Sequence, residues 1–175
     1  MTISVALCER YDPRVHDPVP HPSYVISNAS GQWVDNVLVP LVQLGDDIPV
    51  AQSVEQEVSP VRDGQTTVNF NIYRLDRRLD FGPTAPRTYV ITDAVARAAP
   101  AHLVAAHVPE RTVIAKLAVN VGGGRSAATR ATVSLFFGRT ELSAKAISKT
   151  TGDERKVSLN FEGALMPLPT AFGAK

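Results

Sequence analysis

Apolar and polar residues alternate with a period of two along the stretch Ala131–Phe161, and this alternation predicts three short strands. Gly138-Arg139 fits a two-residue hairpin turn between the first two strands, with glycine in the first position. Gly152 can take the positive φ that the second turn requires. Such a three-stranded meander has one apolar face, so we expect a second layer of structure to cover it.

Further short strand-like segments, separated by turn residues, precede this meander. The clearest is Thr66–Tyr73, which places Val68, Phe70 and Ile72 on one face of a strand. The others span 2–8, 23–26, 33–42, 48–58 and 113–121. Many short strands with turns between them are typical of an antiparallel β-sandwich, so we predict a mainly β fold of that architecture.

Two segments interrupt the strand pattern. Residues 12–22 contain four prolines, which we take to exclude a helix or an internal strand, so we expect an extended connector. Residues 75–112 form an insertion with a short helical stretch over about 93–108, capped by Thr92 or Asp93. The predicted organisation is an N-terminal strand and proline-rich connector (1–22), a β-sandwich domain (23–161) and an extended C-terminal tail (162–175).

Composition agrees with this fold prediction and adds information only about partners and cellular compartment. The chain has 175 residues and a net charge of +1, which suits one domain with a substantial core and indicates no nucleic-acid or membrane-surface partner. No apolar run approaches the roughly 20 residues of a membrane-spanning helix. The N-terminus lacks a secretory pattern and Cys8 is the only cysteine, so we expect a reducing, cytoplasmic compartment.

Residues that could support catalysis or metal binding are few. Cys8 has no adjacent base, and Gly122–Gly124 lacks the Lys-Ser/Thr ending of a phosphate-binding loop. His16 and His21 lie near two aspartates, but their spacing matches no familiar metal-ligand pattern. We therefore expect no metal, no cofactor and no enzymatic activity, and we favour a binding or structural module.

The segment TELSAKAISKTTGDERKVSLNF, residues 140–161, resembles the last strands of the substrate-binding β-domain of Hsp70 chaperones. That family shows a rhythm like Ile-Leu-x-Val-x-Ala-x-Asp-Lys-x-Thr-Gly, followed by a charged turn and another strand. Ile48-Pro49, Asp63-Gly64-Gln65 and the hairpin-like SYVISNASGQWVDNVLV occur upstream in the family's order. The resemblance covers about residues 23 to 161. The family's ATPase domain and helical lid have no counterpart here, and its short connection is replaced by the insertion 75–112.

This resemblance implies a non-catalytic module that binds an extended apolar peptide segment, or a protein partner, at loops on one end of the sandwich. Local matching to the family places Val58, Val61, Val68 and Phe70 near a pocket for one aliphatic side chain, and Ala29 near an arch over the peptide. The alternative is a structural subunit of a homo-oligomer or larger assembly. In that case the sandwich is a scaffold, and residues 12–22 and 164–172 are arms that contact neighbours.

Overall fold

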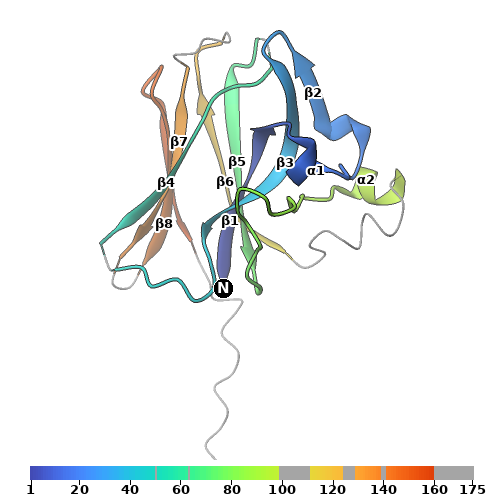
Figure 1. Ribbon diagram of the computed structural model, residues 1–175. Helices are drawn as coiled ribbons and strands as arrows, with labels where there is room; N and C mark the ends of the chain where they lie inside the picture. Colours follow the sequence, from blue (N-terminus) through green and yellow to red (C-terminus); the bar gives the residue numbers. More distant parts are fainter. Residues whose placement is uncertain (50, 63, 99–110, 124–128, 139–140, 160–175) are drawn as a thin grey trace, which may run out of the picture.

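The computed structural model describes residues 1–49, 51–62, 64–98, 111–123, 129–138 and 141–159, and it shows a mainly β protein (Figure 1). Two antiparallel sheets pack face to face. The larger sheet has the order β2-β3-β1-β5-β6, formed by Val25–Asn28, Gly31–Val42, Thr2–Arg10, Thr67–Leu75 and Thr112–Asn120. The smaller sheet has the order β4-β7-β8-β9, formed by Ser53–Val58, Ala131–Phe137, Leu142–Ser148 and Glu154–Leu159.

The meander predicted for residues 131–161 is confirmed as β7, β8 and β9, which are neighbours in the smaller sheet. Gly152 has φ +75° in the β8–β9 turn, as expected. The Gly138 N–H donates to the Glu141 carbonyl (2.8 Å), so these two residues form the last bonded pair. The predicted turn Gly138-Arg139 extends into residues 139–140, which lie outside the described part of the chain.

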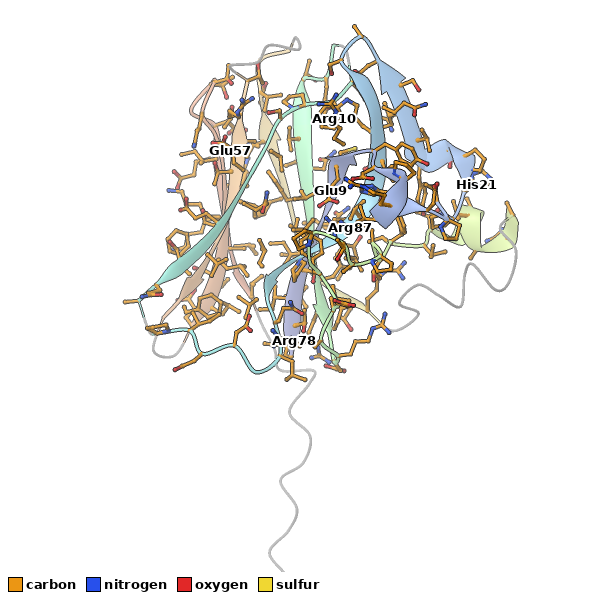
Figure 2. All side chains as sticks on the ribbon, in the orientation of Figure 1. Glu9, Arg10, His21, Glu57, Arg78 and Arg87 are labelled. Atoms are coloured by element: carbon orange, nitrogen blue, oxygen red, sulfur yellow. The ribbon has the colours of Figure 1, made fainter. Side chains whose placement is uncertain are left out.

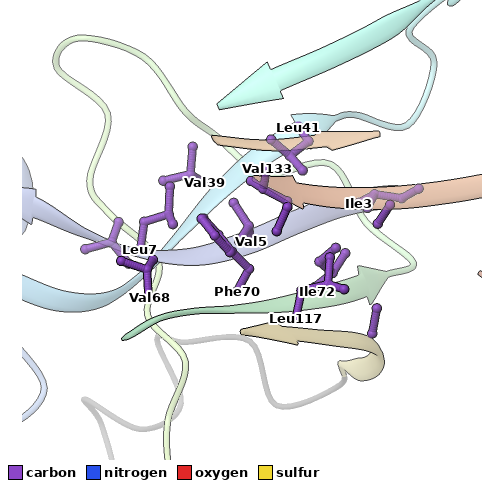
Figure 3. Packing of buried hydrophobic residues seen from close by; sticks show 14 of the residues in the cluster. Ile3, Val5, Leu7, Val39, Leu41, Val68, Phe70, Ile72, Leu117 and Val133 are labelled. Atoms are coloured by element: carbon purple, nitrogen blue, oxygen red, sulfur yellow. The ribbon is translucent and has the colours of Figure 1, made fainter. Parts of the chain in front are cut away.

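Alternating side chains of both sheets meet in one hydrophobic core (Figure 3). The larger sheet contributes Val5, Phe70 and Ile72, and the smaller sheet contributes Val133 and Leu135, all of them fully buried or nearly so. The strand β6 lies against β8 and β9 and closes the sandwich on that side. Period-two alternation therefore accounts for the buried residues of β5 and β6, whereas β1 and β7 are buried on both faces over much of their length.

The N-terminal strand β1 belongs to the centre of the larger sheet. It pairs with β3 on one side and with β5 on the other, and Ile3, Val5 and Leu7 face the core. The division drawn after residue 22 therefore runs through a single sheet. Apolar alternation identified β1 as a strand, but it carries no information about which strands lie beside it.

The prediction that prolines exclude a helix from residues 12–22 is wrong. Pro13–His16 forms a short helix, α1, and Pro22–Tyr24 forms a 3₁₀ turn. Asp12 caps α1, because its Oδ1 accepts from the Arg14 N–H (3.0 Å), and the hydrogen bonds from Arg14 lower the pKa of Asp12 to about 2. Proline stands in the first turn, where its missing N–H removes no hydrogen bond and its fixed φ suits a helix.

The insertion contributes a helix and a second, smaller core. Helix α2 spans Asp93–Ala98, and Thr92 Oγ1 accepts from the Val95 N–H (3.4 Å), which agrees with the predicted cap. The rest of the predicted helical stretch, and the tail 162–175, lie outside the described residues. Before α2, Leu79 and Val90 pack on side chains of β3 and β5. The insertion therefore covers part of the sheet face that points away from the main core.

Candidate functional site

The larger sheet opens between β1 and β5. The described ladder between them runs only from Thr2 opposite Leu75 to Val5 opposite Ile72, although β1 continues to Arg10. Beyond that point β1 stays paired with β3, and β5 stays paired with β6. Over this second half, the facing edges of β1 and β5 therefore present backbone N–H and C=O groups that the opposite strand does not pair.

A β-bulge accompanies this divergence. The register between β1 and β3 shifts by one residue between Leu7 and Glu9, so Cys8 faces two residues of β3, Asp35 and Asn36. Asn36 has φ 62°, a left-handed conformation that asparagine tolerates better than most residues. The extra residue stands on β3, and a bulge bends its strand and increases the local twist, at the level where β1 and β5 have separated.

A cleft of about 390 Å³ occupies the opening, and we call it the strand cleft. Its walls are β1, β5 and the connection from the end of β4 to β5. Its aliphatic lining consists of Leu7, Val58, Val61 and Val68. Amide and hydroxyl side chains form much of the remaining lining, among them Asn36, Gln65, Thr67, Asn69 and Asn71. The strand cleft thus combines unpaired strand edges, a small apolar surface, uncharged polar groups and the ion pair of Arg62 with Asp35.

Three of the five residues proposed from the sequence line the strand cleft, namely Val58, Val61 and Val68. Phe70 lies apart from them, with 0% of its surface exposed in the centre of the main core. Ala29 is exposed at the tip of the β2–β3 hairpin and does not line the cleft. The structure therefore brings together the valines and leaves the phenylalanine and the alanine outside.

Two side-chain contacts attach the β4–β5 connection to the β2–β3 side of the cleft. Asn28 Nδ2 donates to the Val61 carbonyl (2.8 Å), and Arg62 Nη2 lies 3.5 Å from Asp35 Oδ2. Asn28 is the neighbour of Ala29, so the hairpin tip does reach the connection. These contacts hold Val61 over the cleft while leaving its side chain on the cleft wall.

Sequence reasoning missed the contribution of β1 to the strand cleft. Leu7 and Cys8 were assigned to a segment outside the sandwich, although the apolar alternation of residues 2–8 already indicated a strand that needs partners. Asn69 and Asn71 alternate with the core residues of β5, so their position on the other face followed from the sequence. No local signal showed that this face borders an opening in the sheet.

Cys8 lines the strand cleft in an environment that disfavours its thiolate. Burial raises the pKa of the Cys8 thiol, and the Asp35 carboxylate beside it raises it further by charge and by hydrogen bonding. At neutral pH, we expect the folded protein to react with Ellman's reagent at least about tenfold more slowly than the urea-unfolded chain. The substitution Asp35→Asn should increase the rate in the folded state. Equal rates for the folded and unfolded chains would contradict this description of Cys8.

A second hollow, of about 280 Å³, adjoins the strand cleft, and we call it the side crevice. The two share Leu7, Cys8, Val58 and Ser59 as lining residues. The side crevice extends between the β4 edge and the larger sheet. Its own lining is Glu9, Trp33, Val39, Gln56, Glu57 and Phe81.

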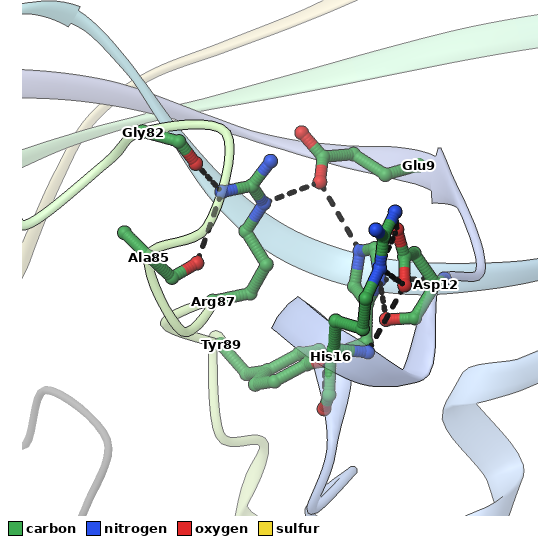
Figure 4. Close-up of polar contacts among 8 residues, drawn as sticks. Glu9, Asp12, His16, Gly82, Ala85, Arg87 and Tyr89 are labelled. Atoms are coloured by element: carbon green, nitrogen blue, oxygen red, sulfur yellow. Dashed lines mark hydrogen bonds and ion pairs between the residues drawn. The ribbon is translucent and has the colours of Figure 1, made fainter.

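A polar network fixes one end of the side crevice (Figure 4). Arg87 Nε donates to Glu9 Oε2 (2.7 Å), and the same oxygen lies 3.2 Å from Nε2 of the buried His16. Arg87 Nη1 also donates to the carbonyls of Gly82 and Ala85, and its guanidinium lies 4.3 Å from the centre of the Phe81 ring. This network connects β1, α1 and the insertion, and it sets the position of the Phe81 wall.

No protein-family model matches the chain, and no curated protein matches it. Within the described residues, no group of three or more His, Cys, Asp or Glu side chains could hold a metal ion. No helix in the same part of the chain is long and apolar enough to cross a membrane.

Proposed function

We propose that this protein is a non-catalytic peptide- or protein-binding module, and that the strand cleft holds one extended apolar segment of its partner. The observation that carries this proposal is the opening between β1 and β5. There, two strand edges without a partner strand border a pocket of aliphatic side chains formed by Leu7, Val58, Val61 and Val68.

An extended segment in this opening would make two kinds of contact. Its backbone would exchange hydrogen bonds with the edges of β1 and β5, as in other cases where a peptide adds a strand to a sheet. One of its aliphatic side chains would pack against the four apolar residues of the cleft. Uncharged amides such as Asn69 and Asn71 would bond the remaining polar groups of the segment's backbone.

The resemblance to the Hsp70 substrate-binding β-domain supports the same class of function. It designates Val58, Val61 and Val68 as pocket residues independently of the structure, and these three line the strand cleft. The competing idea of a structural subunit used residues 12–22 and 164–172 as arms that reach neighbouring molecules, and the second arm lies outside the described residues. Val15, His16 and Pro20 of the first arm are instead buried against their own domain, which favours the binding module.

The substitution Val61→Phe tests the proposal. Val61 lies on the cleft wall, and a phenyl ring at this position would occupy the space intended for the partner's side chain. We expect binding of a short fluorescein-labelled peptide, with one central leucine among serines and glycines, to weaken by about tenfold or more. Fluorescence anisotropy measures the change.

Val113→Phe is the matched control, because Val113 is an exposed valine of β6 that does not line the cleft. This variant should bind the peptide as the unmodified protein does. Equal affinities for the two variants, or failure of the unmodified protein to bind any leucine-containing peptide, would overturn the proposal.

A further inference from the structure

The side crevice continues the strand cleft, and the proposed function as stated leaves it unused. The two hollows adjoin each other, because Leu7, Cys8, Val58 and Ser59 line both. A chain lying in the strand cleft would therefore have a second hollow beside it. What this hollow can accept follows from its walls.

The walls of the side crevice favour an uncharged, apolar occupant. Trp33 and Phe81 supply aromatic surface, and Val39 supplies aliphatic surface. The two carboxylates at its rim already have cationic partners. Glu9 is paired with Arg87, and Glu57 is paired with Lys149 (2.5 Å) and Arg130 (3.1 Å). A cationic side chain would compete with these pairs, whereas an apolar side chain would leave them intact.

Trp33 also has an unused hydrogen-bonding group. Its Nε1 is buried and has no acceptor among the described residues. A buried N–H without an acceptor is unfavourable, and tryptophan usually finds a partner for this group. A small rotation of the ring towards a bound segment would let a main-chain carbonyl of that segment accept from Nε1.

We propose that the side crevice is a second side-chain subsite of the same binding site, and that it selects for a second large apolar residue. This inference rests on the proposed function of the strand cleft. Alternate side chains of an extended chain lie roughly 7 Å apart on one side of it, a spacing suited to two adjoining pockets. The preferred partner is an uncharged extended segment with leucine, methionine or phenylalanine at positions i and i+2.

Trp33 is the only tryptophan of the chain, so its emission reports directly on the side crevice. The probes are three short peptides in a serine-glycine background: one leucine, two leucines at i and i+2, and two adjacent leucines. The i, i+2 peptide should bind about tenfold more tightly than the single-leucine peptide, because it buries one more leucine side chain. It should also be the only one of the three to shift the Trp33 emission.

Two substitutions alter the side crevice without touching the aliphatic pocket of the strand cleft. Phe81→Ala removes a wall, and Gln56→Phe, on the edge strand β4, fills space. Each should abolish the preference for the i, i+2 peptide and retain binding of the single-leucine peptide. Phe136→Ala is the control, since Phe136 is an exposed aromatic residue that lines neither hollow. Circular dichroism establishes that the variants are folded.

The outcomes separate this inference from the proposal on which it rests. If all three peptides bind equally and Trp33 emission does not change, the second subsite is refuted and the strand cleft still stands as a binding site. If Phe81→Ala and Gln56→Phe leave the i, i+2 preference intact, the second subsite is again refuted. If no peptide binds, both are overturned.

Discussion

Replacing Phe70 with alanine is expected to lower the free energy of unfolding by about 3 to 5 kcal/mol. The ring is completely buried in β5, and it lies among Val5, Leu7, Val68 and Leu117 in the centre of the core (Figure 3). Its removal loses the transfer free energy of the ring and leaves a cavity that the two sheets cannot fully close. Urea denaturation followed by circular dichroism measures the change.

Phe136→Ala is the control for this substitution, because Phe136 is 37% exposed on the outside of β7. Its effect should stay within about 0.5 kcal/mol. The comparison also tests the role assigned to Phe70 from the sequence. If Phe70 is a core residue and not a wall of the site, the folded fraction of Phe70→Ala should bind leucine peptides with the affinity of the unmodified protein. A specific loss of affinity in folded Phe70→Ala would indicate that Phe70 does belong to the binding site.

Local alternation explains why the strands could be predicted and why Phe70 was grouped with Val68. The two residues are two positions apart on β5, so the pattern places both on the same buried face. Val68 lies farther than Phe70 from Ile72, where the ladder between β1 and β5 ends, and it lines the cleft, whereas Phe70 is fully buried in the core between the two sheets. This difference arises from the path of another strand, and no local pattern encodes it.

The proline-rich segment shows a second limit of reasoning from residue types. Proline disfavours the interior of a helix but suits its first turn, and Pro13 stands in the first turn of α1, directly after the cap Asp12. The cap Asp12 and Pro13 in the first turn are sufficient to start a helix as short as α1. The prediction took the four prolines to exclude any helix, because it did not consider the position of each proline within a turn.

The side crevice could not be predicted from the sequence, because it is formed by elements that are far apart along the chain. Its main walls, Leu7, Trp33, Val58 and Phe81, come from β1, β3, β4 and the insertion. None of these residues has a neighbour in sequence that marks it as part of a site. Their convergence depends on β1 lying inside the larger sheet and on the insertion folding back over that sheet.

Replacing Arg87 with alanine is expected to lower the free energy of unfolding by about 3 kcal/mol, because it removes one partner of a largely buried ion pair. The Arg87 side chain is 12% exposed and that of Glu9 is 22% exposed, so the Glu9 carboxylate would lose its guanidinium partner with little water to replace it. The carbonyls of Gly82 and Ala85 would lose a donor in the same step. Chemical denaturation measures the loss.

Arg78→Ala is the matched control for Arg87→Ala, and both arginines are labelled in Figure 2. Arg78 also pairs with a carboxylate, Asp46 (3.3 Å), and donates to a carbonyl, but its side chain is 58% exposed. Water and salt screen such a pair, so its loss should cost no more than about 1 kcal/mol. Replacing Glu9 and Arg87 together by Gln and Met should recover part of the stability, because neither charge is then left buried alone. If Arg87→Ala costs no more than Arg78→Ala, the network around Glu9 does not hold the insertion against β1 and α1, and the position of the Phe81 wall must have another cause.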